Sequence, residues 1–214
     1  NLTMSMVMVR MLWLLNKFLE KREDQMGAKI DLYLDELARY QKSISSKLSE
    51  VDGPHDWTHP LRMLKIGEQL VDFVKFDVRE FKAAVILHNI DRIKSYQKSI
   101  SEDGLDVTCR SILLGSGFTR ESEDRITDAV AGHFKLDKGG DSSLLTALRS
   151  ADRIDWLGLI GISGAAYMWT INGFYGDPDP FAPAEKGKPR NFYQDLIRQT
   201  EWYAMLPSNE VRSI

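Results

Sequence analysis

The sequence contains a single cysteine, Cys109, so no disulfide can form within the chain and a zinc site built from several cysteines is excluded. This cysteine usage is typical of a reducing compartment, and we expect a cytoplasmic protein. Neither sign of charge dominates, because the chain has 28 Lys and Arg residues and 31 Asp and Glu residues, which gives a net charge of -3. The balance argues against a dedicated nucleic-acid scaffold but leaves open a local basic cleft for a phosphate-bearing substrate.

Long hydrophobic runs are also missing. The most apolar stretch, from Met4 to Leu15, is interrupted by Arg10 and is too short to span a bilayer. It also lacks the small-residue cleavage site of a secretory signal. Because Met6 and Leu12 belong to a pattern with helical spacing, the stretch is interpreted as a packing helix, and no membrane partner is expected.

The period-two alternation of half-buried strands is rare, whereas apolar residues recur three and four positions apart through most of the chain. We therefore expect an all-α fold in the form of a single-domain helical bundle. With 214 residues and 43% hydrophobic content, the chain is large enough for one core. Residues 1–48 are expected to form N-terminal helices that pack on the core, and residues 49–214 the main helical domain.

Glycine and proline are concentrated in a few breaks between these helices. The segment with the most glycine and proline, residues 172–191, is predicted to be a long loop. This loop either closes over a substrate or is a disordered surface loop. A second break at residues 51–54 separates the N-terminal helices from the rest. Helices are expected at residues 60–73, 78–92, 121–134, 144–159 and 192–206.

The four histidines lie at predicted helix ends, close to acidic residues. His59 is at the start of one helix, and His88 and His133 are near the C-terminal ends of two others. Asp152 lies on a further helix. Imidazole and carboxylate groups from separate helices can converge on one divalent ion, so His59, His88 and Asp152 are candidate metal ligands.

The residues before His59 have two interpretations. Asp56 either orients an imidazole and accepts a proton from a water molecule, or it caps the helix that begins near Pro60. His55 is four residues before His59, but Pro54 and Pro60 argue against one continuous helix through both histidines. We therefore expect His55 to support the site and not to bind metal.

Further candidates surround these ligands in the sequence. His133 is interpreted as a catalytic residue that contacts phosphate or completes a second metal position, with core packing as the alternative. Asp91, three residues after His88, is another candidate acid. Arg153 is expected to pair with Asp155. Cationic side chains near the ligands are candidates for binding substrate phosphate, namely Arg62, Lys65, Arg92 and Arg153.

Three motifs together carry a family resemblance. They are His55-Asp56-Trp57-Thr58-His59, Leu87-His88-Asn89-Ile90-Asp91 and Ala151-Asp152-Arg153-Ile154-Asp155, the last followed by Leu157-Gly158-Leu159-Ile160-Gly161-Ile162. In this order they resemble the HD superfamily of metal-dependent phosphohydrolases, and within it the small stand-alone bacterial HD proteins, some of which release pyrophosphate from nucleoside triphosphates. The resemblance implies a bundle of helices around a metal site whose ligands are His59, His88, Asn89 and Asp152.

Asn89 departs from the family pattern, because the histidine of the doublet is normally followed by aspartate. The amide offers only a neutral carbonyl oxygen, so we expect weaker metal binding. Three explanations remain open: an engineered inactivating substitution, a natural loss of activity, or a site that still holds metal with help from Asp91. A purely structural role for the amide at a helix end is a further alternative.

The resemblance implies a hydrolase that acts on a phosphate ester or anhydride, above all a nucleotide, with Mn, Mg, Fe or Zn as cofactor. The alternative is a catalytically inactive HD-like module that binds nucleotides or a partner. A homodimer is left open.

Overall fold

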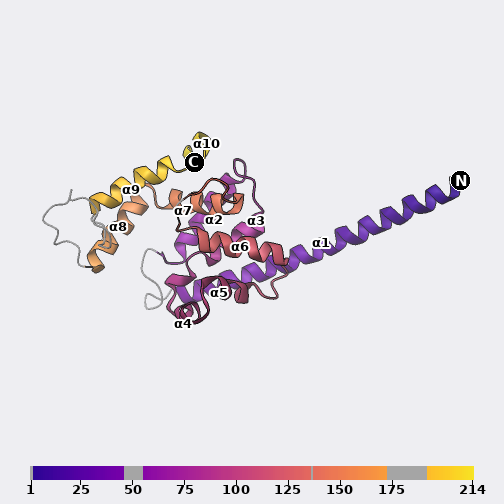
Figure 1. Cartoon of the computed structure of the whole chain (residues 1–214), viewed down its shortest axis with the longest axis horizontal. Helices are drawn as coiled ribbons and strands as arrows, with labels where there is room; N and C mark the ends of the chain where they lie inside the picture. Colours follow the sequence, from indigo (N-terminus) through magenta and orange to yellow (C-terminus); the bar gives the residue numbers. More distant parts are fainter. Residues whose placement is uncertain (1, 46–54, 136, 173–191) are drawn as a thin grey trace.

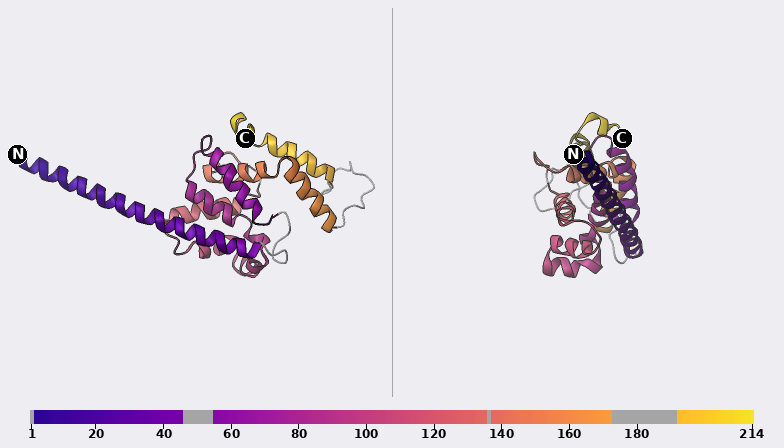
Figure 2. Two further views of the ribbon diagram at one scale, coloured as in Figure 1. Left: turned by 180° about the vertical axis from the view of Figure 1, so that it is seen from behind. Right: turned by 90° about the vertical axis from the view of Figure 1, so that its right-hand side faces the viewer.

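The computed structural model describes residues 2–45, 55–135, 137–172 and 192–214. Every regular element in these ranges is a helix, which confirms the all-α fold. The first element, α1 (Leu2–Ser45), is one continuous helix of 44 residues in place of the separate N-terminal helices predicted. Its N-terminal half extends away from the body of the protein (Figures 1 and 2). Leu34 and Leu37 of its C-terminal half are buried in the core.

Four helices form the centre of the bundle. They are α2 (Thr58–Leu70), α3 (Val78–Leu87), α6 (Arg120–Gly132) and α7 (Ser143–Asp155). Helix α2 packs against α3 and α7, and α6 packs against α3 and α7. The apolar stripes of these helices meet in a single main core, which includes Met63, Leu87, Ile126 and Leu148. The candidate site residues lie on these four helices or directly beside their ends.

Two predicted helices end earlier than the sequence pattern indicated. The Asp77 carboxylate caps α3 by accepting hydrogen bonds from the backbone N–H groups of Arg79 and Glu80. The helix then ends at Leu87, and a short 3-10 helix, η2 (Ile90–Arg92), follows. Similarly, α6 ends at Gly132 and not at residue 134. Both ends coincide with a histidine whose ring binds a backbone carbonyl of the last turn, as described below.

Of the helices that were not predicted, two are adjacent in the chain. They are α4 (Lys94–Asp103) and α5 (Leu105–Leu113), which pack on each other across Gly104. Gly104 has a φ angle of 93°, a conformation that other residues rarely adopt. No residue of α4 is buried, so its sequence lacks the apolar stripe on which the prediction depended.

The C-terminal part begins where a predicted helix is interrupted. The helix expected at 144–159 ends at Asp155, and α8 (Gly158–Asn172) starts at Gly158, whose φ angle is 68°. Helix α8 packs against α9 (Phe192–Ala204), which also contacts α7, and α10 (Asn209–Arg212) follows (Figure 1). Apart from Asn172, the predicted loop at 172–191 lies outside the described residues. No helix in the described part of the chain is long and apolar enough to cross a membrane.

Candidate metal centre

His59 is held in the first turn of α2 by a buried carboxylate. Its Nδ1 donates a hydrogen bond of 2.6 Å to Asp155 Oδ2. Arg62, one turn further along α2, binds both oxygens of the same carboxylate, with Nε at 2.6 Å and Nη2 at 2.8 Å. Because Asp155 occupies Nδ1, the ring presents Nε2 to the neighbouring side chains, as in histidine ligands held by a carboxylate.

His88 and His133 are held in the same way as each other. Each follows the last residue of a helix, α3 or α6, and these helices pack side by side. The Nδ1 of His88 donates to the carbonyl of Val85, and the Nδ1 of His133 to that of Val130, both at 2.7 Å. A carbonyl only accepts, so Nδ1 carries the proton and Nε2 keeps its lone pair in the neutral ring. The two rings lie 5.4 Å apart.

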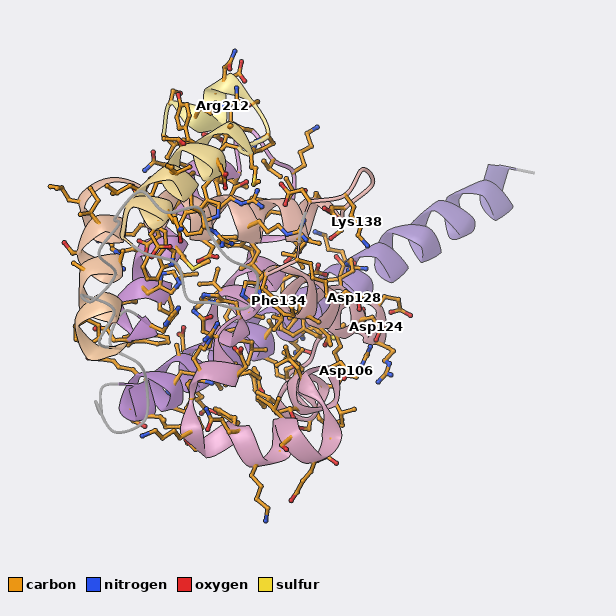
Figure 3. The ribbon with its side chains drawn as sticks, turned by 60° about the vertical axis from the view of Figure 1, so that its left-hand side comes forward. Asp106, Asp124, Asp128, Phe134, Lys138 and Arg212 are labelled. Atoms are coloured by element: carbon orange, nitrogen blue, oxygen red, sulfur yellow. The ribbon has the colours of Figure 1, made fainter. Side chains whose placement is uncertain are left out.

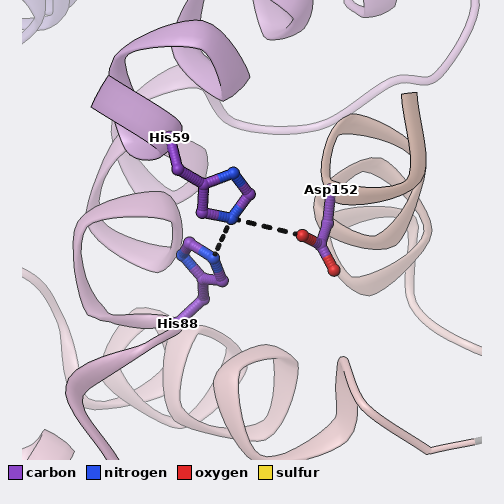
Figure 4. A group of neighbouring side chains, drawn as sticks. All are labelled: His59, His88 and Asp152. Atoms are coloured by element: carbon purple, nitrogen blue, oxygen red, sulfur yellow. Dashed lines mark hydrogen bonds and ion pairs between the residues drawn. The ribbon is translucent and has the colours of Figure 1, made fainter. Parts of the chain in front are cut away.

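Three of the predicted ligands converge. Nε2 of His59 lies 3.0 Å from Nε2 of His88 and 3.3 Å from Oδ1 of Asp152 (Figure 4). The ligand atoms of the three residues all lie within 4.8 Å of one another. In a tetrahedral site with zinc–ligand bonds of roughly 2.0–2.1 Å, neighbouring ligand atoms should be about 3.3–3.4 Å apart, which matches the His59–Asp152 distance and is slightly longer than that between the two imidazoles. The donor set and its spacing therefore fit a divalent ion.

Asn89 is also at this cluster. Its Nδ2 donates to Nε2 of His88 at 2.7 Å, the same nitrogen that would bind a metal. The amide therefore occupies the vicinity that the family pattern assigns to a carboxylate. Rotation of the amide by 180° would bring Oδ1 to the position of Nδ2, which is the orientation required of a metal ligand.

The charges of the cluster favour a cation at its centre. Burial alone would lower the pKa of His59, but hydrogen bonds and charges from Asp152 and Asp155 outweigh it and raise the pKa to about 9. Burial opposes ionisation of Asp152, yet His59 holds the pKa of its carboxyl well below the usual range. Burial and the neighbouring His59 lower the pKa of His88, which stays neutral. Without a metal ion, His59 is therefore protonated at neutral pH, and its imidazolium provides the positive charge beside Asp152 and Asp155.

Asp56 lines a small cavity together with His88 and Asn89 of this cluster. Its Oδ1 accepts hydrogen bonds from the backbone N–H and the hydroxyl of Thr58, the first residue of α2, at 2.9 and 2.5 Å. Arg62 Nη1 in turn donates to the Thr58 hydroxyl at 2.9 Å. The carboxylate thus binds the start of α2 and also lies beside two residues of the cluster, so the structure agrees with both interpretations of Asp56.

The predicted cationic residues do not all reach one site. Arg62 binds Asp155, so its guanidinium supports the candidate ligand His59 through that carboxylate. The predicted pairing of Arg153 with Asp155 is wrong, because Arg153 binds Asp137 through two hydrogen bonds of 2.7 and 2.5 Å. Lys65 is exposed on α2 and is not among the residues that line the pocket described below.

Arg92 and Asp91 differ in their position relative to the cluster. Arg92 follows Asn89 on η2 and lines the pocket beside the candidate ligands. Asp91 lies within 3.6 Å of Arg92 Nε. Its carboxylate is not part of the group whose ligand atoms lie within 4.8 Å of one another. The structure therefore brings Asp91 near the site without placing it among the ligands.

A pocket of about 480 Å³ opens beside Asp152, Asn89 and His133. Its opposite wall comes from α9, which sequence reasoning did not connect with the site because its pattern is that of an ordinary amphipathic helix. Phe134, labelled in Figure 3, and Lys135 follow His133 at its edge. The residues from α9 are Arg198, Glu201 and Trp202.

Trp156 covers the histidines next to this pocket. Its ring lies 5.6 Å from that of His55 and 5.9 Å from that of His59. Two glycines of α8 let it approach, since a Cβ atom on Gly161 would lie 1.8 Å from the Trp156 carbonyl oxygen, and one on Gly164 would lie 2.5 Å from its ring. His55 thus contacts the rings of His59 and Trp156 and is not one of the three grouped ligand candidates.

Comparison with known proteins identifies relatives of the same fold. No family model matches the chain. The chain is 26% identical over 166 residues to the uncharacterized protein YpgQ of Bacillus subtilis, a match that covers 72% of this chain and 74% of the relative. The crystal structure of YpgQ in complex with ADP aligns with a TM-score of 0.59 and 19% identity over 84% of this chain and 86% of the relative. That of the Lin1889 protein from Listeria innocua aligns with a TM-score of 0.60 and 14% identity over 86% of each chain. The chain therefore shares its helical fold with these proteins.

Proposed function

We propose that this chain is a metal-dependent phosphohydrolase of the HD type that hydrolyses a phosphate ester or anhydride of a nucleotide. The observation that carries the proposal is the convergence of His59, His88 and Asp152 from three helices, with their ligand atoms within 4.8 Å of one another. Chance clustering of surface charges does not account for it, because both imidazoles are buried and each is oriented through Nδ1.

His59, His88 and Asp152 would hold the ion, with Asn89 Oδ1 as a neutral fourth ligand. A bound Mn, Mg, Fe or Zn ion would polarise a phosphoryl oxygen and lower the pKa of a bound water. His133 lies on the pocket side of His88, with Nδ1 bound to Val130, so its Nε2 remains to accept a proton from the attacking water and, once protonated, to donate a hydrogen bond to a phosphoryl oxygen.

Two observations support a nucleotide as the substrate class. YpgQ, which shares the fold, was crystallised with ADP. The pocket of this chain, at about 480 Å³, lies within the range of roughly 300–1,000 Å³ typical of small-molecule sites. It also combines cationic side chains such as Arg92 and Lys135 with aromatic ones such as Trp202.

A second function is favoured by Asn89. An amide in place of the acidic ligand leaves the donor set with one negative charge, that of Asp152, and a less negative donor set binds a cation more weakly. The alternative is therefore an HD-like module that binds a nucleotide without hydrolysing it.

Metal analysis and turnover assays on this chain and on Asn89→Asp distinguish the two functions. The hydrolase proposal expects metal-dependent release of phosphate or pyrophosphate from a panel of nucleotides and phosphate esters, and faster release by Asn89→Asp. Asn89→Ala, which removes the ligand atom without adding charge, is the matched control. The module alternative expects nucleotide binding with no turnover by either variant. If neither the chain nor Asn89→Asp binds Mn, Mg, Fe or Zn, the hydrolase proposal fails.

A further inference from the structure

We infer that α9 forms the nucleoside-binding end of the pocket, where Trp202 and Arg198 provide a flat surface for the base and Glu201 accepts hydrogen bonds from the nucleoside. The inference rests on the proposed function, since it requires a nucleotide in this pocket. It assigns the polyphosphate to the end that contains the candidate metal ligands.

The two ends of the pocket differ in chemistry. One end contains Asp152, Asn89 and His133, which are the candidate metal ligands and a neighbouring imidazole. The other end is the face of α9 that carries Arg198 and Trp202, one helical turn apart. A ligand with one strongly anionic part and one planar part matches both ends.

Apart from Arg198, whose guanidinium lies over the Trp202 ring, the exposed cations of the pocket lie near the first end. Arg92 and Lys135 follow Asn89 and His133 closely in the chain and line the pocket. The remaining pocket arginines of the central helices are bound by aspartates. Arg153 binds Asp137, and Arg149 donates to Asp141 at 2.6 Å. Arg92 also lies near an aspartate, Asp91, but its side chain is 53% exposed, against 4% for Arg149 and 11% for Arg153. Arg92 and the exposed Lys135 are thus the best placed to contact a polyphosphate that reaches the ligand cluster.

Glu201 determines the orientation of the ligand. A phosphate placed at the α9 end would meet this carboxylate, and like charges at contact distance repel. A carboxylate accepts hydrogen bonds from the amino groups of a base and from ribose hydroxyls. The electrostatics of the pocket therefore direct the nucleoside toward α9 and the phosphates toward Arg92 and Lys135.

Trp202 and Arg198 supply the surface on which a base can stack. The Arg198 guanidinium lies over the Trp202 ring, 5.2 Å from its centroid. Bases stack on both indole rings and guanidinium planes, and each of the two groups is planar. Trp202 also lines a small cavity of about 110 Å³ between α8 and α9, together with Trp156.

Isothermal titration of the full chain with ADP and with tripolyphosphate, each with Mn²⁺, tests the assignment, because only ADP carries a nucleoside. We expect Trp202→Leu to weaken ADP binding about tenfold or more and to leave tripolyphosphate binding within twofold. Glu201→Gln, an exposed substitution that preserves shape, should weaken ADP binding several-fold and slightly strengthen tripolyphosphate binding. Tyr203→Leu is the matched control, since Tyr203 is the next aromatic on α9, is 49% exposed and does not line the pocket.

The outcomes separate this inference from the function on which it rests. Unchanged ADP affinity in both Trp202→Leu and Glu201→Gln overturns the assignment, as does an equal loss for ADP and tripolyphosphate in both variants. If the wild-type chain hydrolyses a simple phosphate ester with metal but does not bind ADP, the inference is overturned while the hydrolase proposal stands. If the chain binds ADP through Trp202 but has no metal-dependent turnover, the inference stands and the hydrolase proposal falls.

Discussion

His59 and Asp155 are joined by a hydrogen bond of 2.6 Å between the imidazole Nδ1 and the carboxylate Oδ2, and both residues are buried. This bond turns Nε2 of His59 toward His88 and Asp152. Arg62 binds both carboxylate oxygens, so Asp155 itself cannot rotate away without breaking that pair. The orientation of one candidate ligand thus depends on a residue that would not touch the metal.

Replacement of Asp155 by asparagine should weaken metal binding by about 10- to 100-fold, because a neutral amide holds the imidazole less firmly and lowers its basicity. Titration of the metal-free protein with Zn²⁺ or Mn²⁺ measures the effect. Asp128→Asn makes the same chemical change on α6, on the side of the body away from α8 (Figure 3). Equal metal affinity in wild type, Asp155→Asn and Asp128→Asn would show that Asp155 does not position His59.

Much of the fold was predictable, because apolar spacing marks amphipathic helices. The prediction lost accuracy where the pattern was weak or where a side chain ended a helix. Helix α4 has no buried residue, so no stripe marked it. The early end of α3 coincides with the hydrogen bond from His88 to the carbonyl of Val85, a tertiary feature that helix propensity does not encode.

The candidate ligands were predictable for a similar reason. His59, His88 and Asp152 belong to short motifs, and the structure brings them together. The residues that support these ligands through hydrogen bonds and ion pairs were not predictable, since such pairing depends on the direction in which each side chain leaves its helix. Arg153 is the clearest case. It was predicted to pair with Asp155 but binds Asp137, and Asp155 is bound by Arg62 instead. The residues of α9 that line the pocket form no recognisable sequence motif, so they were not predicted either.

The pH dependence of stability should differ between the metal-free and the metal-bound protein. His59 has a folded-state pKa of about 9, above its ordinary value of 6.5. Its contribution to the free energy of unfolding is therefore complete below pH 6.5 and is lost as the pH rises through about 9. The loss should be on the order of 3 kcal/mol at most. Urea unfolding with a chelator at pH 6.5 and pH 9.5 measures it, and His59→Gln should remove most of the difference.

Metal binding should show the opposite trend, because the ion requires the unprotonated Nε2 of His59. The affinity for Zn²⁺ or Mn²⁺ should rise by up to tenfold per pH unit between pH 6.5 and about 9. A metal affinity that is independent of pH over this range would contradict the assignment of His59 as a ligand.

Arg149 should be essential for stability, because its side chain is only 4% exposed and binds both acidic and backbone groups. It donates to Asp141, to the carbonyl of Gly132 at 2.8 Å and to that of His133 at 3.3 Å, so it holds the end of α6. Arg149→Met leaves these acceptors without their donor, and we expect a loss of about 3–5 kcal/mol in the free energy of unfolding. Arg120→Met, at an exposed ion pair in the first turn of α6, the opposite end of that helix, should cost no more than about 1 kcal/mol. Similar losses in the two variants would refute a special role for Arg149.

Gly161 gives a test in which two effects have opposite signs. Alanine at this position of α8 would gain about 1 kcal/mol of helix propensity over glycine. Its Cβ, however, would lie 1.8 Å from the Trp156 carbonyl oxygen, a backbone atom that cannot move alone. We expect the steric clash to outweigh the gain in helix propensity, with a net loss of about 1–3 kcal/mol in the free energy of unfolding.

The same substitution should also affect the site, since displacement of Trp156 removes the ring that lies 5.9 Å from that of His59. Metal affinity of Gly161→Ala should fall together with its stability, and both are measurable on one sample by titration and by urea unfolding. Gly139→Ala is the control, because a Cβ there meets no atom within 4 Å, and it should change neither quantity. A Gly161→Ala variant more stable than the wild type would mean that helix propensity decides at this position and that α8 does not need close contact with Trp156.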